Sequence, residues 1–120
     1  MFELSITDHI AAAHFLKGYS GPCKDLHGHT WKIEITIQSN KLNSIGLVVD
    51  FQEMKKKFKT FLDHIDHVTL NDLPAFKKDN PSTENIARYI YRQFGKQCRP
   101  FKLMKVRVWE SDIASITYFE

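Results

Sequence analysis

Hydrophobic and polar residues alternate at the start of the chain. Phe2, Leu4 and Ile6 are separated by single polar residues, which predicts a strand with one buried face. The same parity continues to His14, so that side chain is expected to point toward the core. Residues 8–9, Asp-His, are a candidate β-bulge within this strand.

A second alternating segment covers residues 27–38. Its apolar positions are Trp31, Ile33, Ile35 and Ile37. His27 and His29 share their parity, which predicts that both imidazoles lie on the core side of the sheet.

The spacing becomes helical from Asp50 onward, where a stripe recurs every three or four residues: Phe51, Met54, Phe58, Phe61 and Leu62. Asp50 and Glu53 are placed as a capping box, and the helix should end near Asp63. A second helix begins after Ser82, its predicted N-cap, and ends close to Gly95. Its buried stripe consists of Ile86, Ile90 and Phe94.

Two further strands close the chain. Met104, Val106, Val108 and Glu110 share one parity. Residues 111–112 are the expected turn, and Ala114, Ile116 and Tyr118 continue beyond it. The order strand, strand, helix, helix, strand, strand predicts an α+β fold with a four-stranded antiparallel sheet and both helices on one face. Free sheet edges are usually paired or protected, so we also expect oligomerisation.

Size and composition narrow the class of protein. With 120 residues and a net charge of +3, residues 1–120 are expected to form one domain. The lysines are scattered without an arginine and aromatic stripe, which argues against nucleic acid as a partner. No apolar run reaches membrane-spanning length and no signal pattern opens the chain, so a cytoplasmic location is expected. Cys23 and Cys98 are not expected to form a disulfide.

Three histidines carry the strongest chemical signal. His14 ends the first predicted strand, and His27 and His29 begin the second, so a hairpin would bring all three together. Three imidazoles with one open position are typical of catalytic zinc, whereas structural zinc sites are closed and rich in cysteine. The alternative is that each histidine is an ordinary core residue.

Other candidate residues surround this site. Cys23 precedes the histidines, where a nearby cation would favour its thiolate; it could act as a base or nucleophile, or close the site as a fourth ligand. Asp66 and His67 form a candidate acid–base pair. Residues 63–64 have the same letters, Asp-His, but fall at a helix end, where a surface histidine is favoured.

Glu110 has core-side parity at the end of a strand, where an unpaired charge is costly. A carboxylate there could accept two adjacent N–H donors from a pterin or guanine ring. Alternatively, strand parity breaks at the following turn and Glu110 is solvated.

Together these motifs resemble the 6-pyruvoyl-tetrahydropterin synthase family. The similarity extends over nearly the whole chain, through AAAHFL, CKDLHGHTW, VDFQEMK, IDHVTLND, NPSTEN and VRVWES. It implies that His14, His27 and His29 are zinc ligands, and that Cys23 is the catalytic thiol. It selects Asp66 and His67 as the catalytic pair. It also implies that Glu110 holds the pterin ring, in a pocket lined by Ser82, Thr83 and Glu84.

The short spacing between Cys23 and HGH resembles the bacterial 6-carboxy-tetrahydropterin branch, although Trp31 is bulkier than expected beside the site. That branch implies a lyase converting 7,8-dihydroneopterin triphosphate to 6-carboxy-5,6,7,8-tetrahydropterin, acetaldehyde and triphosphate, on the route to queuosine. The alternatives are a 6-pyruvoyl-tetrahydropterin synthase, another pterin side-chain lyase, or a non-catalytic zinc module.

The family resemblance also has implications for assembly. It implies the tunnelling fold, in which trimers close their sheets into a barrel and two trimers stack into a homohexamer. Active sites then lie between subunits, and Glu110 can serve a neighbour's zinc.

Overall fold

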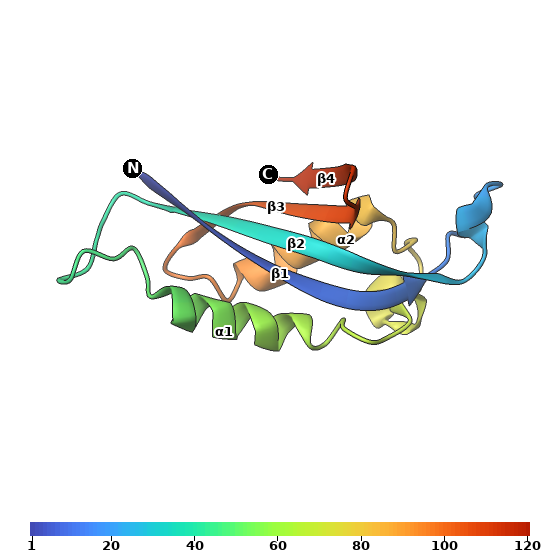
Figure 1. Ribbon diagram of the computed structural model, residues 1–120, viewed down its shortest axis with the longest axis horizontal. Coiled ribbons are helices and arrows are strands. Elements are labelled where there is room, and N and C mark those ends of the chain that lie inside the picture. The colour runs from blue at the N-terminus through green and yellow to red at the C-terminus, as the bar shows by residue number, and fades with distance from the viewer.

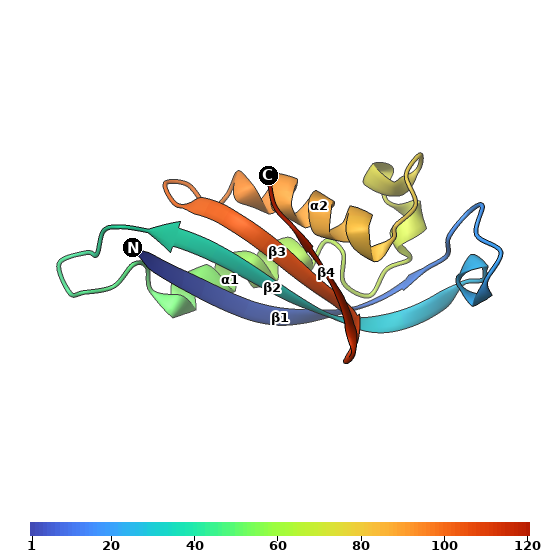
Figure 2. The ribbon, with the colours of Figure 1, turned by 90° about the horizontal axis from the view of Figure 1, so that it is seen from above.

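Each alternating segment of the sequence forms a strand, and each segment with helical spacing forms a helix. The computed structural model describes residues 1–120 and contains four strands and two α-helices: β1 (Phe2–His14), β2 (His27–Ser39), α1 (Phe51–Leu62), α2 (Thr83–Gly95), β3 (Lys102–Ser111) and β4 (Ala114–Tyr118). The strands form one antiparallel sheet in chain order. Both helices cover the same face of that sheet, as expected (Figures 1 and 2).

The core lies between this face and the helices. All four predicted inward residues of β2 are fully buried, as is the predicted stripe of α2. On α1 the stripe is confirmed for four residues but wrong for Phe51, which is 58% exposed. Phe51 is the first residue of α1, so it lies at the helix end rather than under the sheet.

Both N-caps form as predicted. The side chain of Asp50 accepts a hydrogen bond from the Gln52 backbone N–H, and Ser82 accepts one from Asn85. Glu53 makes no hydrogen bond back to the cap, so the complete capping box is absent. Each cap satisfies a backbone donor that the first helical turn leaves free.

Two irregularities in β3 change its register. Its pairing shifts opposite Thr36 and Ile37, so Leu103 rather than Met104 is the buried residue at its start. A second shift falls between Trp109 and Ser111, at Glu110. The pairing of β1 with β2 is continuous, so the expected bulge at residues 8–9 does not occur.

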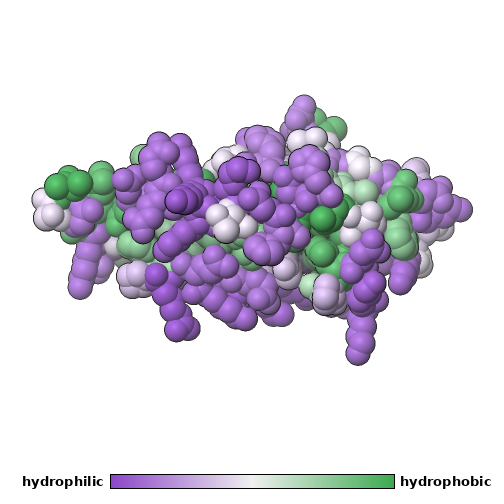
Figure 3. All heavy atoms as spheres, turned by 90° about the horizontal axis from the view of Figure 1, so that it is seen from below, coloured by the Kyte–Doolittle hydropathy of each residue, from purple (hydrophilic) through white to green (hydrophobic).

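The β1–β2 hairpin is long and extends past the two shorter strands, giving a molecule of 53 × 25 × 22 Å (Figure 1). The face that carries α1 is mainly hydrophilic, with apolar side chains at the end where the loop before α1 lies (Figure 3). Leu42, Ile45 and Leu47 are the exposed apolar residues of that loop. Neither helix has the length and apolar character needed to cross a membrane.

Candidate metal centre and active site

The register of the β1–β2 hairpin brings the three histidines together. His14 pairs directly with His27, and Ala12 pairs with His29. Because side chains two residues apart share a face of the sheet, His27 and His29 project side by side. The imidazole centroids of the three rings lie 4.6–5.3 Å apart.

Their ring nitrogens converge in a geometry that fits a metal ion. The Nε2 atoms of His14 and His27 are 3.0 Å apart. The ligand atoms of the three histidines and Glu110 all lie within 4.8 Å of one another. A tetrahedral zinc with nitrogen ligands at about 2.0–2.1 Å holds them roughly 3.3 Å apart. The buried Nε2 of His29 makes no hydrogen bond, although the Glu110 carboxylate lies 3.2 Å away, so this nitrogen also fits a metal ligand.

Backbone carbonyls define the tautomers of two rings. The Nδ1–H of His14 donates to the Pro81 carbonyl, and that of His27 donates to the Asp25 carbonyl, each at 2.6 Å. Each Nε2 therefore presents a lone pair. Two facing lone pairs repel unless a cation or proton lies between them, so the arrangement favours a metal.

Protonation of the site is disfavoured. Burial lowers the pKa of His14, and neighbouring His27 and His29 lower it further. Burial also lowers the pKa of His29, although the Glu110 carboxylate opposes this. The imidazoles of His14 and His29 thus favour the neutral form, which is the form that binds metals.

Glu110 lies beside these rings in the same chain. Its carboxylate is 3.2 Å from His29 Nε2 and 3.7 Å from His14 Nε2, and its side chain is 33% exposed. The irregularity in β3 at this position is a β-bulge, a feature that often re-aims a side chain beside a functional site. Glu110 therefore faces the histidines while retaining access to solvent; its parity predicted the core side of the sheet, but not this contact.

Asp66 and His67 form the predicted pair, with 3.0 Å between the carboxylate and His67 Nδ1. His67 has a φ of 56°, in the left-handed region that few non-glycine residues adopt, and its side chain is 79% exposed. It lines a hollow of about 530 Å³ that also includes His29. His67 thus shares a cavity with one of the candidate ligands, and Asp66 supports it from beside that cavity.

The second Asp-His pair lies at the end of α1, as expected. His64 Nδ1 is 3.1 Å from the Thr60 carbonyl and 3.2 Å from that of Phe61. These contacts satisfy the last turn of the helix and leave His64 away from the histidine cluster.

Cys23 lies in a short 3₁₀ turn, Pro22–Lys24, at the tip of the hairpin, and is half-buried. Its sulfur is not among the convergent ligand atoms. The fourth donor in this chain is instead the carboxylate of Glu110, so the structure favours the reading of Cys23 as a loop thiol over that of a metal ligand.

Ser82 and Thr83 begin α2 beside the site. Ser82 uses its hydroxyl as the helix cap, and Thr83 is buried. The preceding residue, Pro81, is the one whose carbonyl holds His14. The sequence contained no signal for this contact, or for the one from Asp25, because both acceptors are backbone atoms.

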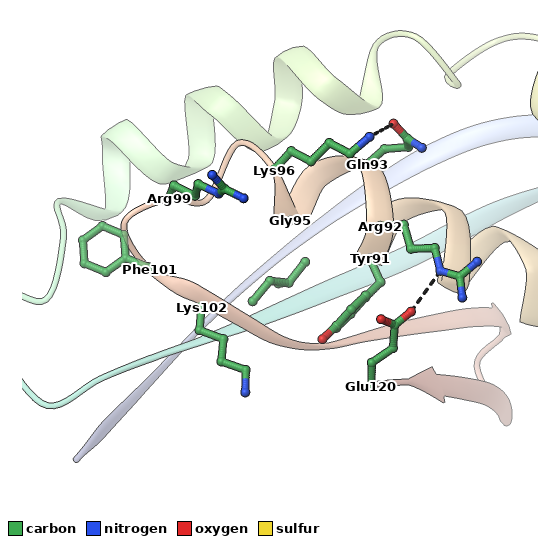
Figure 4. A pocket seen from close by; sticks show the side chains of 10 residues that line it. Tyr91, Arg92, Gln93, Gly95, Lys96, Arg99, Phe101, Lys102 and Glu120 are labelled. Atoms are coloured by element: carbon green, nitrogen blue, oxygen red, sulfur yellow. Dashed lines mark hydrogen bonds and ion pairs between the residues drawn. The ribbon is translucent and has the colours of Figure 1, made fainter.

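A second large hollow, of about 580 Å³, lies elsewhere, between the end of α2 and the start of β3 (Figure 4). It contains Arg92, Lys96, Arg99 and Lys102, but Arg92 is already paired with Glu120. Arg92 and Lys96 lie in the last turn and at the C-cap of α2, where the helix dipole favours cations without a ligand.

Trp31 has an unusual environment beneath the histidines. It is fully buried, yet its indole Nε1 has no hydrogen-bond partner. Leaving such a donor unpaired costs about 1–3 kcal/mol.

Comparison with known proteins identifies relatives across the chain. Residues 3–120 match the 6-pyruvoyl tetrahydropterin synthase family. The 6-carboxy-5,6,7,8-tetrahydropterin synthase of Bacillus subtilis is 39% identical over 95 residues, which span 75% of this chain and 63% of that protein. The enzyme of the same name from Haemophilus influenzae is 29% identical over the full length of both chains. The Caenorhabditis elegans 6-pyruvoyl tetrahydropterin synthase structure superposes with a TM-score of 0.90 at 26% identity, covering 99% of this chain and 95% of that one.

Proposed function

Because the chain belongs to the 6-pyruvoyl tetrahydropterin synthase family of lyases, we propose that it is a zinc-dependent carbon–carbon lyase. Its proposed substrate is 7,8-dihydroneopterin triphosphate. The products are 6-carboxy-5,6,7,8-tetrahydropterin, acetaldehyde and triphosphate, on the route to queuosine, in the cytoplasm. Two relatives bearing the 6-carboxy name support this choice. The observation that carries the proposal is the convergence of three imidazoles beside one carboxylate.

His14, His27 and His29 would hold the zinc, through their Nε2 atoms. Bound there, zinc would polarise the oxygens of the substrate side chain and acidify the carbon beside them. The remaining chemistry belongs to this chain's own residues.

Glu110 would anchor the pterin ring, because an ionised carboxylate can accept two parallel N–H bonds. Cys23, as a thiolate, would remove a proton from the side chain. His67 would return or relay a proton, with Asp66 fixing its tautomer and stabilising the imidazolium. Ser82 and Thr83 would line the pterin pocket.

The direct test supplies the zinc-loaded protein with 7,8-dihydroneopterin triphosphate and identifies the products by mass spectrometry. The expected products are the 6-carboxy pterin and acetaldehyde. Absence of any turnover by a fully zinc-loaded protein would contradict the proposal.

A second candidate is 6-pyruvoyl-tetrahydropterin synthesis, which the close superposition on the C. elegans protein favours. The same assay distinguishes it, because the pyruvoyl product keeps the carbons that are otherwise released as acetaldehyde.

A non-catalytic zinc module is the third candidate. The position of Glu110 as a fourth donor favours it, because a closed set of four ligands is typical of structural zinc. Such a module has no use for the Asp66–His67 pair and predicts no turnover.

We further propose a homohexamer built from two trimers, with the active sites between subunits and residues 1–120 as one domain. β4 and the first part of β1 are the sheet edges. Residues 66–69 cover only the end of β1, through bonds such as Ala13 N–H to the Val68 carbonyl at 3.0 Å. Light scattering should give a mass six times that of the chain; a monomer would contradict this assembly.

A further inference from the structure

The Trp31 side chain packs against two of the three candidate ligands. Its ring meets His14 edge to face, with centroids 4.9 Å apart and planes at 86°. It meets His29 in the same manner, at 5.0 Å and 72°. These histidines belong to different strands, so one buried indole contacts imidazoles on both sides of the hairpin.

The three histidines are oriented in different ways. His14 and His27 each donate Nδ1–H to a backbone carbonyl, which sets the rotation of the ring. His29 makes no such bond, and the carboxylate of Glu110 lies 3.2 Å from its Nε2. The orientation of His29 therefore depends on the side chains packed around it, and Trp31 is the largest of these.

The pattern of β2 does not require tryptophan at position 31. The next three inward positions, Ile33, Ile35 and Ile37, are aliphatic and fully buried. An aliphatic residue at position 31 would continue that core without burying an unpaired indole N–H. The side chain at this position is thus better explained by the histidines above it than by the core below.

We propose that Trp31 is a positioning residue of the metal site: its ring holds the imidazoles of His14 and His29 so that their Nε2 atoms converge. The proposal rests on the proposed metal-binding function. It is independent of which pterin is the substrate, because Trp31 acts through the two histidines.

The test compares Trp31→Leu and Trp31→Phe with the wild type, and uses Ile33→Val as a matched control on the same face of β2. Zinc affinity is measured by competition with a chelator, and geometry by the visible spectrum of the Co²⁺ form. Melting of the metal-free proteins reports core packing separately.

Trp31→Leu should lose about 10-fold or more in zinc affinity and alter the Co²⁺ spectrum, as expected when a group that orients a ligand is removed. Trp31→Phe retains a ring edge and should recover most of the affinity. Ile33→Val should lower the melting temperature of the metal-free protein yet keep wild-type zinc affinity.

Wild-type zinc affinity and an unchanged Co²⁺ spectrum in Trp31→Leu would overturn the positioning role. Should that variant fail to fold, Trp31→Met, which also lacks a ring edge, takes its place, and wild-type zinc affinity with an unchanged Co²⁺ spectrum in Trp31→Met would do the same. A wild-type protein that binds zinc but does not turn over the pterin overturns the proposed reaction and not this role.

Discussion

At the scale of residues, the chemistry of the site follows from where protons are held. The Nδ1–H groups of His14 and His27 donate hydrogen bonds to backbone carbonyls, so the Nε2 atom of each ring keeps a free lone pair. Burial keeps His14 and His29 neutral. The carboxylates are arranged differently, since Glu110 faces the imidazoles and Asp66 supports a histidine outside the cluster.

Replacing Cys23 tests the proposed base. Cys23→Ala should reduce kcat by about 100- to 10,000-fold, the usual contribution of a general base, while zinc stays near one per chain. Cys98→Ala is the control: burial raises the pKa of Cys98 to about 11, so it remains a thiol, and its removal should leave kcat unchanged. Retained activity in Cys23→Ala would remove Cys23 from the mechanism.

Replacing Glu110 separates its two possible roles. Glu110→Gln should keep zinc bound but lower kcat/KM about 10- to 100-fold, because hydrogen bonds to a charged group contribute about 1.5–3 kcal/mol each. Glu34→Gln, on the opposite face of the sheet, is the control. Atomic absorption measures the zinc content and distinguishes the two roles. Loss of zinc from Glu110→Gln would show that Glu110 is a metal ligand.

Asp66 should make stability depend on pH. A hydrogen bond from the Ala11 backbone, followed by one from His67, lowers the pKa of Asp66 below its ordinary value of 3.8. The ionised Asp66 carboxylate therefore stabilises the folded state above pH 3.8. This stabilisation is lost as the pH falls through the lower pKa that Asp66 has in the folded state. Asp66→Asn should destabilise the protein at pH 7, and the difference from wild type should shrink in acid.

Urea unfolding at several pH values measures this difference. Asp63→Asn is the control, because it removes only an exposed pair with Lys59, and such pairs contribute at most about 1 kcal/mol. A difference between Asp66→Asn and wild type that stays constant down to pH 3 would contradict the prediction.

At the scale of elements, the start of α2 connects helix stability to the metal site. Ser82 caps the helix, and the residue before it holds His14 through a carbonyl. Loosening the cap should therefore affect both the helix and the orientation of one candidate ligand. The cap of α1 is not adjacent to a residue that holds a candidate ligand, so α1 serves as the control for α2.

Ser82→Ala should lower the free energy of unfolding by about 1 kcal/mol and weaken zinc binding by up to about 10-fold. Asp50→Ala removes the cap of α1 at a similar cost, about 1 kcal/mol, and should leave zinc affinity unchanged. Chemical denaturation and chelator competition measure the two effects. Equal zinc affinities in the two variants would show that the cap does not influence the site.

At the scale of the whole molecule, most of the core lies away from the site, although Trp31 belongs to the core and contacts two of the histidines. The hydrophobic cluster contains 23 buried residues and runs along the sheet under both helices, whereas the histidines gather toward one end of the hairpin. We therefore expect the chain to fold without metal, in contrast to zinc fingers, which are unfolded without it.

Removing the metal should lower the melting temperature without unfolding the chain. Zinc that binds only the folded state adds about 2.7 kcal/mol at a free concentration 100 times its Kd. After chelation, the far-UV circular dichroism should keep its helix and strand content at 25 °C, and zinc should restore the melting temperature. Loss of the folded spectrum on chelation would show that the metal is structural.

The periodicity of apolar residues predicted the type and order of the strands and helices, because an element that buries one face repeats its apolar residues at a fixed spacing. It was less reliable at element ends and bulges. Phe51 fits the helical stripe but lies at the exposed end of α1. Leu103 is buried in place of Met104 because the β3 register shifts, and pairing between strands that are distant in the sequence, such as β2 and β3, has no local signal.

The sequence by itself determined the order of elements, the shared face of the sheet and the gathering of His14, His27 and His29, since hairpin pairing and side-chain parity are local rules. The tertiary structure alone decided that carbonyls of Pro81 and Asp25 orient two of these rings, that Glu110 faces them within one chain, and that Trp31 packs beneath. Those contacts join segments distant in sequence or use backbone atoms common to every residue, so no pattern of side chains can specify them in advance.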